Sequence, residues 1–247
     1  MPKLRTFVEN EFNFLLERDN LRDAREFFQG NPFVHIPKVY PELCSRRMVV
    51  MEYCEGVKIN DIDTLKKRNI DLHQLGQICL TTFADMIFRS SKLHIDPHAG
   101  NLFVRLNPQT KEPQLILLDH GMYMYYRKSF NEDFQKLWLA MISQDKEEIK
   151  KCCEPWGMEE YSEVLSVVFT GRSSQWNHKL GEQMSEEEMQ EMREKMMEKM
   201  KNTPVDKKKI EEHMKKMEAM MKVIPLELMA VLRVQMLVGL VWEIECS

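Results

Sequence analysis

The stretch HIDPHAGNLFVR, residues 94–105, decides how the rest of the chain is interpreted. Two histidines, an aspartate and an asparagine lie within eight residues, and an apolar run follows at once. Pro97 and Gly100 exclude a regular helix here, so the polar residues belong to a loop. Such a loop can be a metal site, an acid/base site for catalysis, or a polar turn without chemistry.

A zinc site is the first alternative. His94, Asp96 and His98 alternate, and alternate side chains of an extended strand share one face, where three ligands could converge. Pro97 and Gly100 argue against such a strand. A neutral imidazole can donate a hydrogen bond with one ring nitrogen and accept one with the other. We therefore expect His94 and His98 to hold the loop through hydrogen bonds and not to bind zinc.

A longer pattern favours phosphoryl transfer. Asp96 and Asn101 are five residues apart, and the runs LFVRL and QLILLDH are predicted strands of a hairpin with NPQTKEP between them. The hairpin would return the chain beside the loop and bring Asp119 near Asn101. In a phosphoryl-transfer site, one carboxylate orients the attacking hydroxyl, while an asparagine and a second carboxylate bind Mg²⁺. Gly121 would let the backbone turn sharply after Asp119.

Composition sets the broad class. The chain has 247 residues, of which 43% are hydrophobic and 30% charged, as is typical of a globular protein with a sizeable core. The net charge of −4 implies no general affinity for nucleic acids. The six cysteines include no CxxC pair, which favours reduced structural thiols. The beginning, MPKLRTFVENEF, lacks the features of a signal peptide or presequence.

Hydrophobic periodicity predicts an α+β fold. We expect helices at residues 9–29 and 71–89, and β-type runs at FVHIPKV and RRMVVMEY with the turn PELCS between them. From Arg127 onward the chain is predicted to be helical. The run PLELMAVLRVQMLVGLVW is interrupted by Glu227 and Arg233, so it predicts a buried helix and not a membrane span. The apolar face of the helix at 71–89 would comprise Leu72, Leu75, Cys79, Phe83 and Met86.

Residues 181–222 differ in character, being dense in Glu, Lys and Met. Pro204 divides the segment into two predicted helices, and several methionines fall on one stripe of the first. We expect a charged, Met-rich helical hairpin whose methionines pack on the domain. A contact with a protein partner, or with a membrane or lipid surface, stays open as an alternative for this stripe.

Together, HIDPHAGNLFVR and LILLDHG resemble the UbiB-type atypical kinases, also called aarF-domain-containing kinases. The catalytic loop of that family has the form H-x-D-P-H-x-G-N, and its counterpart of D-F-G can read D-H-G. The resemblance implies a protein-kinase-like fold that binds ATP and Mg²⁺. It further implies a partial small β lobe over residues 1–56 and a mainly helical large lobe over residues 57–247.

The resemblance also assigns roles within the motifs. Asp96 would be the catalytic-loop aspartate, while Asn101 and Asp119 would be the metal ligands. His98 and Gly100 would shape the loop at the nucleotide site.

Two further stretches fit the same family. ENEFNFLLERDN, residues 9–20, resembles the family pattern E-x-D-F-x-x-E-x-x-N. Glu17 then matches the glutamate that pairs with the ATP-binding lysine, and Asn13 stands where the family has an aspartate. RRMVVMEYCEG resembles the last strand and the hinge of the small lobe. There the side chain of one residue would face the adenine, and the backbone of the next three would bond it; these cofactor-binding residues are Met51, Glu52, Tyr53 and Cys54.

Some family features are missing from this sequence. The phosphate-binding loop, its lysine and the K-x-G-Q element should precede the helix that carries Glu17, and only Lys3 lies upstream. We therefore expect either a partial chain or gene model, or an N-terminally truncated member of the family. Catalysis without these elements would be weakened, because phosphoryl transfer depends on positioning and charge neutralisation. Ile95 replaces the arginine of H-R-D and no A-P-E segment follows, so control by activation-loop phosphorylation is not expected.

By resemblance, the chain would be a mitochondrial kinase or ATPase linked to lipid or coenzyme Q metabolism. Two alternatives stay open. Small-molecule phosphotransferases of the aminoglycoside or choline kinase type share H-x-D-x-x-x-x-N, although D-H-G and the pattern in residues 9–20 favour the UbiB type. A pseudokinase scaffold would bind nucleotide without turnover, and the missing lysine is the feature that supports it.

Overall fold

The computed structural model describes residues 13–170, 219–220 and 223–243. The chain divides into two compact units. Unit 1 comprises Met1–Asn131 with Leu226–Ser247, and unit 2 comprises Glu132–Pro225. The loop at residues 94–101 and the hairpin that follows it both belong to unit 1. The lobe boundary at residue 56 stays a prediction.

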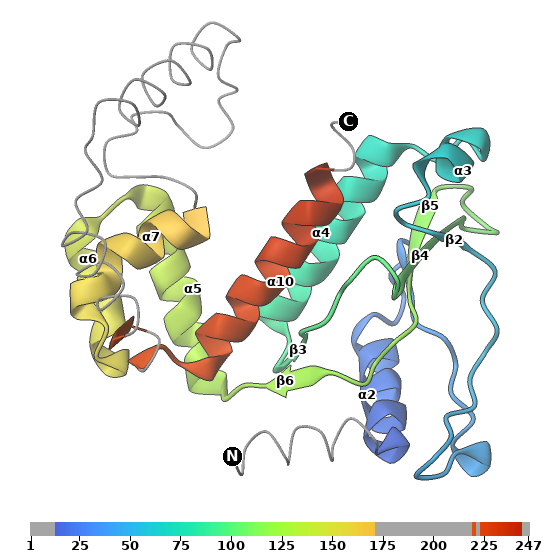
Figure 1. The fold of residues 1–247 in the computed structure, drawn as a ribbon, viewed down its shortest axis with the longest axis horizontal. Helices are drawn as coiled ribbons and strands as arrows, with labels where there is room; N and C mark the ends of the chain where they lie inside the picture. The colour runs from blue at the N-terminus through green and yellow to red at the C-terminus, as the bar shows by residue number, and fades with distance from the viewer. Residues whose placement is uncertain (1–12, 171–218, 221–222, 244–247) are drawn as a thin grey trace, which may run out of the picture. The chain divides into compact units, whose positions relative to one another are not determined.

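A four-stranded sheet with the order β1-β5-β4-β2 forms the centre of unit 1 (Figure 1). Strands β4 (Leu102–Leu106) and β5 (Pro113–Leu117) pair antiparallel, which confirms the predicted hairpin. β1 (Val34–His35) pairs parallel with β5, and β2 (Val57–Lys58) pairs antiparallel with β4. Every residue of β5 is buried, as is typical of a strand that has neighbours on both edges.

The hairpin turn is fixed by Asn107. Its side-chain oxygen accepts a hydrogen bond from the backbone N–H of Gln109 at 2.9 Å, and its amide donates to the carbonyl of Pro32 at 2.8 Å. Lys111 closes the turn with a φ of 63°, in the left-handed region. The turn therefore sets the register of the hairpin and ties it to the segment that leads into β1.

Helix α4 (Leu72–Arg89) covers the sheet and ends just before the functional loop. It begins at Asp71, whose side chain accepts from the backbone N–H of Gln74 at 3.0 Å, as expected of an N-cap. The short helix α3 (Ile62–Lys67) precedes it and is capped in the same way by Asp61. The prediction for residues 71–89 is confirmed; the buried residues of its expected apolar face are Leu75, Cys79, Phe83 and Met86.

Helix α2 (Phe14–Phe27) is the described part of the helix predicted at residues 9–29. It packs through Leu21 and Ala24, and Gly30 with a φ of 82° turns the chain after its end. The two-stranded sheet of β3 (Lys92–His94) and β6 (Tyr123–Tyr125) was not predicted. These strands flank the functional loop, the one immediately before it and the other after the D-H-G motif.

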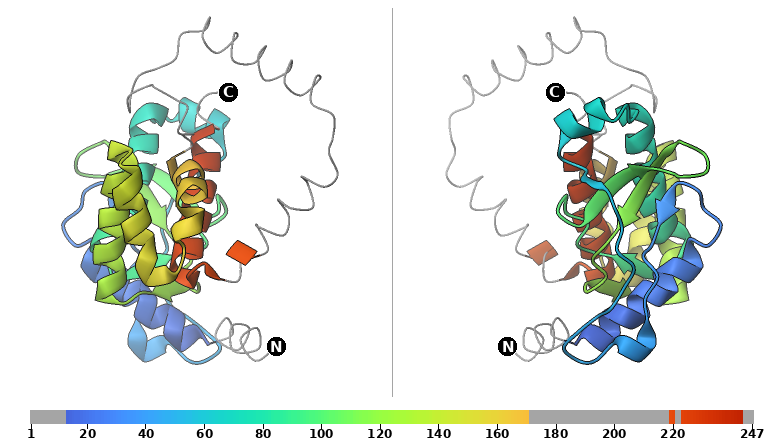
Figure 2. Two further views of the ribbon diagram at one scale, coloured as in Figure 1. Left: turned by 90° about the vertical axis from the view of Figure 1, so that its left-hand side faces the viewer. Right: turned by 90° about the vertical axis from the view of Figure 1, so that its right-hand side faces the viewer.

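Helix α10 (Leu226–Glu243) packs along α4 and also contacts β3 (Figure 1 and Figure 2). This confirms the helix predicted from the apolar run at residues 225–242; its buried side chains are Leu228, Ala230, Val231, Val234 and Val238. Among the described residues, the helices are all too short or too polar to cross a bilayer.

The prediction of two strands at FVHIPKV and RRMVVMEY was only partly right. The second run makes two isolated bridges, Val39 with Met51 and Ser45 with Met48, and PELCS contains the 3₁₀ helix η1 (Pro41–Leu43). Backbone hydrogen bonds from Tyr40 N–H to Val50 (2.9 Å) and from Glu52 N–H to Lys38 (2.7 Å) still join the two runs. Two prolines in the first run and its turn have no N–H to donate, which limits the ladder.

Unit 2 is helical, as predicted for the chain after Arg127. It contains most of α5 (Lys128–Ser143), α6 (Lys146–Cys153) and α7 (Ser162–Thr170), with the 3₁₀ helices η2 (Glu154–Trp156) and η3 (Glu159–Tyr161) between the last two. Phe134 packs on Phe169 with ring centroids 5.6 Å apart. The predicted Met-rich hairpin at 181–222 lies outside the described residues apart from 219–220, and it stays a prediction.

Candidate active site

Asn101 joins the functional loop to the D-H-G motif. Its side-chain nitrogen lies 3.4 Å from the backbone oxygen of Asp96 and 3.3 Å from Oδ2 of Asp119. The backbone N–H of Leu118 also donates to the carbonyl of Asn101 at 3.1 Å. The hairpin thus returns the chain beside the loop, and the three predicted site residues lie together. Their catalytic and metal-binding roles stay predictions.

One carboxylate oxygen of Asp119 faces Asn101. The other, Oδ1, accepts a hydrogen bond from the backbone N–H of Gly121 at 2.8 Å. A side chain at residue 121 would crowd this oxygen, because its Cβ would lie only 3.3 Å away. A carboxylate oxygen next to an amide is a donor set that suits Mg²⁺. The residues fit the cation, which would be held by Asp119 and Asn101 once the Asn101 amide turns its oxygen toward Asp119.

His94 anchors the start of the loop from the core. Its ring is buried, Nδ1 lies 3.2 Å from the carbonyl oxygen of Met122, and the ring stacks on Tyr123 with centroids 5.2 Å apart. Burial lowers the pKa of His94, so the imidazole is neutral and donates through Nδ1. The hydrogen-bonding role predicted for His94 is confirmed.

His98 and Gly100 shape the tip of the loop. The backbone N–H of Gly100 donates to Nδ1 of His98 at 3.1 Å. A Cβ at residue 100 would lie only 2.8 Å from Cε1 of His98, so any other residue here would push the ring away from the backbone. Nε2 of His98 lies 3.7 Å from Oδ2 of Asp96. The hydrogen bond predicted for His98 is present, whereas its role at the nucleotide stays a prediction.

Glu17 lies beside the D-H-G motif. Burial and the neighbouring charge of Asp119 raise the pKa of Glu17, while a hydrogen bond from the backbone of His120 opposes the rise. Helix α2 therefore presents a half-buried carboxylate next to the predicted metal ligand. Lys3 lies outside the described residues, and the pairing of Glu17 with an ATP-binding lysine stays a prediction.

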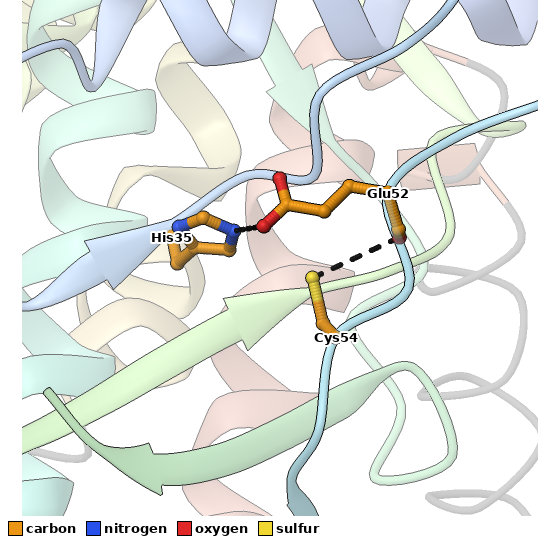
Figure 3. A group of neighbouring side chains, drawn as sticks. All are labelled: His35, Glu52 and Cys54. Carbon is orange, nitrogen blue, oxygen red and sulfur yellow. Dashed lines mark hydrogen bonds and ion pairs between the residues drawn. The ribbon is translucent and has the colours of Figure 1, made fainter. Parts of the chain in front are cut away.

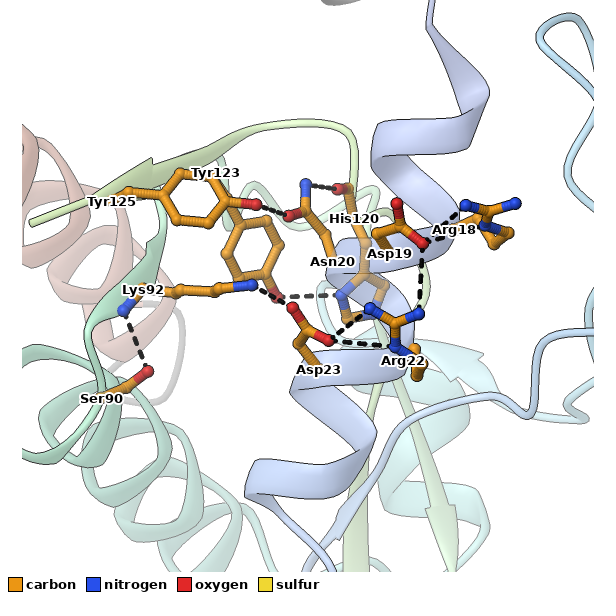
Figure 4. Close-up of polar contacts among 10 residues, drawn as sticks. All are labelled: Arg18, Asp19, Asn20, Arg22, Asp23, Ser90, Lys92, His120, Tyr123 and Tyr125. Carbon is orange, nitrogen blue, oxygen red and sulfur yellow. Dashed lines mark hydrogen bonds and ion pairs between the residues drawn. The ribbon is translucent and has the colours of Figure 1, made fainter. Parts of the chain in front are cut away.

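A residue without a predicted role, Asn20, fixes α2 to the same motif (Figure 4). Its amide donates to the backbone oxygen of His120 at 3.0 Å, and its oxygen accepts from the hydroxyl of Tyr125. On the next turn of α2, Asp23 forms an ion pair with Lys92 of β3. Asn20 is the last position of the E-x-D-F-x-x-E-x-x-N pattern, so the pattern itself was the signal that could have identified it.

His120 takes the central position of D-H-G as a buried, neutral ring. Nε2 donates to the carbonyl of Leu117 at 3.0 Å, and Nδ1 accepts from the hydroxyl of Tyr123 at 2.9 Å. Burial, reinforced by the neighbouring His94, lowers the pKa of His120 to about 3. Burial likewise raises the pKa of the Tyr123 hydroxyl. Both hydrogen bonds of the ring are satisfied, which fixes the backbone that carries Asp119.

The segment expected to bind adenine is anchored by Glu52 (Figure 3). Its carboxylate lies 3.1 Å from Nε2 of His35 and accepts from the backbone N–H of Lys38 at 2.9 Å. Burial alone would raise the pKa of Glu52. The hydrogen bond from Lys38, the contact with His35 and the charge of Arg25 outweigh burial, so the pKa is lowered. Cys54 is buried beside this pair, with its Sγ 3.9 Å from the backbone oxygen of Glu52.

The other two residues of this segment differ in exposure. Met51 is half-buried and forms the isolated bridge to Val39, while the side chain of Tyr53 is 88% exposed. Contacts of Met51, Glu52, Tyr53 and Cys54 with a nucleotide stay predictions.

A residue that the sequence interpretation missed reaches Asp96 from the C-terminal helix. Nη2 of Arg233, on α10, lies 2.8 Å from Oδ1 of Asp96. The two residues are 137 positions apart, and Arg233 was noted only as an interruption of an apolar run. No local motif could have indicated the contact.

Comparison with known proteins identifies the family of the chain. The sequence profile of the ABC1 atypical kinase-like domain matches residues 1–153. The chain is 36% identical over 163 residues to AarF domain-containing protein kinase 1 of Xenopus tropicalis, covering 66% of this chain and 31% of that protein. It is 35% identical to the probable serine/threonine-protein kinase abkB of Dictyostelium discoideum, covering 65% and 24%. The chain thus spans about a third or less of the length of these curated relatives.

A solved structure shows the same fold. The Rv3197–erythromycin complex from Mycobacterium tuberculosis matches with a TM-score of 0.52 at 20% identity, over 97% of this chain and 56% of that one. With the profile match, this confirms the predicted α+β, protein-kinase-like fold.

Proposed function

Because the chain belongs to the ABC1 atypical kinase-like family, we propose that it binds ATP with Mg²⁺ and acts on the terminal phosphoryl group. The observation that carries this proposal is the position of Asn101 between the backbone of Asp96 and the carboxylate of Asp119. Phosphoryl transfer of the protein-kinase type uses a catalytic-loop aspartate, and it uses a nearby asparagine and a second aspartate to hold Mg²⁺.

In this proposal each residue has a separate task. Mg²⁺ bound by Asp119 and Asn101 would neutralise charge on the phosphates. Asp96 would orient the hydroxyl or water that attacks and would accept its proton. Glu17 and Asn20 would hold α2 against the backbone of His120 and so keep Asp119 in place.

The cellular role is proposed on family resemblance alone. We place the chain in mitochondria, as a kinase or ATPase linked to membrane lipid or coenzyme Q metabolism. The nucleotide is the proposed small-molecule partner, and a membrane or lipid surface is a proposed further partner. Import of the tagged chain into isolated mitochondria, or its exclusion from them, tests the location.

Thermal-shift titration tests nucleotide binding directly. A ligand that binds only the folded state, supplied at ten times its Kd, adds about 1.4 kcal/mol to the free energy of unfolding. For a chain of this size that shift corresponds to about 3 to 5 °C. We expect wild type to respond to ATP or ADP more strongly with Mg²⁺ than without, and Asp119→Asn to lose the Mg²⁺-dependent part.

Two controls separate the roles. Asp63→Asn removes an equivalent charge from an exposed position of α3 and should respond as wild type does. Asp96→Asn should retain Mg²⁺-dependent binding but lose turnover, since Asp96 acts on the hydroxyl. If wild type and Asp119→Asn respond equally, the metal role of Asp119 is wrong. If Asp96→Asn leaves turnover unchanged, the assignment of the catalytic aspartate is wrong.

A further inference from the structure

The contact between Arg233 and Asp96 joins two distant parts of unit 1. Nη2 of Arg233 lies 2.8 Å from Oδ1 of Asp96, which is the geometry of a charge-assisted hydrogen bond. The Asp96 side chain is 22% exposed and that of Arg233 is 50% exposed. The carboxylate is therefore mostly withdrawn from water, and screening of the pair is weaker than at a fully exposed position.

The backbone around Arg233 is fixed by packing. α10 buries Leu228, Val231, Val234 and Val238, which follow one another at helical spacing along one face, and this helix packs against α4 and β3. β3 in turn leads directly into the loop that carries Asp96. Helix and loop are thus held by the same core, so the arginine is positioned by that core. The family profile ends at residue 153, and Arg233 lies beyond it.

The charge of Arg233 has a specific consequence at this site. Asn101 contacts the backbone oxygen of Asp96 and the carboxylate of Asp119, so the loop residue Asp96 and the acidic residue Asp119 belong to one small polar cluster. Paired acidic side chains attract divalent cations, and a cation on Asp96 would block the oxygen that must accept the hydroxyl proton. A guanidinium stays charged at all accessible pH values and occupies Oδ1 in a fixed direction.

We propose that Arg233 is a positioning residue that pins the Asp96 carboxylate and keeps divalent cations on Asp119 and Asn101. This inference rests on the proposed function for the roles of these three residues. Oδ2 of Asp96 is left to the attacking hydroxyl, because the nearest imidazole nitrogen, Nε2 of His98, is 3.7 Å away. That distance is too long for a hydrogen bond.

Binding of Mn²⁺ without nucleotide tests the inference independently of turnover. Free Mn²⁺ is measured by electron paramagnetic resonance in the presence of the full chain. Arg233→Met removes the charge and keeps the apolar stem, and we expect it to bind Mn²⁺ about tenfold more tightly than wild type. The double variant Asp96→Asn with Arg233→Met should return to the wild-type affinity, because the carboxylate that gains the cation is then absent.

Arg89→Met is the matched control. Arg89 also pairs with an aspartate, Asp85, at 3.0 Å, but on the exposed end of α4. Its removal changes the net charge by the same amount and should leave Mn²⁺ affinity unchanged. The inference would be overturned if Arg89→Met and Arg233→Met increased the Mn²⁺ affinity equally, or if neither increased it.

Turnover supplies the second readout. Arg233→Met should lower kcat about tenfold to a hundredfold with KM for Mg·ATP within about twofold, and Arg233→Lys should restore part of kcat. A rise of kcat in Arg233→Met would show that the ion pair is a brake and would overturn the positioning role. If wild type turns over no nucleotide, the proposed function fails, yet the Mn²⁺ measurements on Arg233 and Asp96 still decide whether the arginine keeps cations off the carboxylate.

Discussion

Asn20 on α2 donates a hydrogen bond to the backbone oxygen of His120 at 3.0 Å, although the two residues are 100 positions apart. Asn20 is buried, and its side-chain oxygen accepts from the hydroxyl of Tyr125 on β6. Asn20 therefore joins helix α2 both to the backbone next to Asp119 and to strand β6. We therefore expect the position of Asp119, the predicted metal ligand, to depend on Asn20.

Replacing Asn20 by alanine tests this dependence. The carbonyl of His120 would lose its buried donor, so we expect the free energy of unfolding to fall by about 1 to 3 kcal/mol, measured by urea denaturation. The Mg²⁺-dependent thermal shift with ATP should also be reduced. Asn131→Ala is the matched control, because Asn131 also donates to a backbone carbonyl, that of Ser90, at 3.0 Å. Equal losses of nucleotide response in both variants would contradict a specific link between Asn20 and Asp119.

The buried histidines predict a pH dependence of stability. Burial lowers the pKa of His94, and that of His120 falls from an ordinary 6.5 to about 3, so the unfolded chain binds protons that the folded chain does not. Stability should therefore be fully present above about pH 6.5 and fall below it, by about 1.4 kcal/mol per pH unit from His120, with a further loss from His94 in the same direction. The raised pKa of Glu17 acts in the opposite direction, because there the folded chain binds the extra proton.

His120→Phe isolates one histidine. The ring shape is kept and the titration removed, so denaturation between pH 6.5 and 5 should show a shallower loss of stability than wild type, from a lower starting value. His73→Phe, at an exposed position of α4, serves as the control and should retain the wild-type slope. An unchanged slope in His120→Phe would mean that this ring is not the buried neutral group described here.

A side chain at position 100 should displace the ring of His98. Gly100→Ala places a Cβ within 2.8 Å of the His98 ring, and because that ring is partly exposed and can move, we expect a modest loss of about 1 kcal/mol. We also expect turnover to fall, by more than the small loss of stability explains, because the displaced loop tip lies beside Asp96. In a His98→Ala background, Gly100→Ala should lower the free energy of unfolding by less. An equal loss of stability in both backgrounds would show that the clash is not with His98.

The core beneath the loop depends on Phe83. This side chain of α4 is fully buried. We expect Phe83→Ala to lower the free energy of unfolding by about 3 to 5 kcal/mol, measured by urea denaturation. Leu80→Ala is a suitable comparison, because Leu80 lies on the same helix but is 46% exposed. A loss in Leu80→Ala as large as that in Phe83→Ala would mean that the buried face of α4 is assigned incorrectly.

Local signals in the sequence predicted the parts of unit 1 that surround the functional loop. Pro97 and Gly100 marked the loop, alternating and apolar runs marked β4 and β5, and helical spacing marked α4 and α10. Each of these signals is contained within about twenty residues. They predicted that Asp119 would return to Asn101, because a hairpin is a local structure.

Contacts between distant segments were not predictable in the same way. β1 and β2 have two residues each and β3 and β6 have three, which is too short for a periodic pattern, and β1 pairs with β5 some 80 residues later. The contacts Asn20–His120 and Arg233–Asp96 depend on how helices pack on the hairpin. A single sequence contains no signal for such packing, and the family pattern that includes Asn20 gives no partner for it.

The central claim is that Asp119 and Asn101 bind the cation while Asp96 is kept for the attacking hydroxyl. An experimental structure of the chain with Mg²⁺ and a non-hydrolysable ATP analogue tests it most directly. We expect Mg²⁺ at about 2.0 to 2.1 Å from oxygens of Asp119 and Asn101, with Asp96 still paired to Arg233 and free of metal. Mg²⁺ bound by Asp96, or a nucleotide bound away from the loop at residues 94–101, would contradict the account.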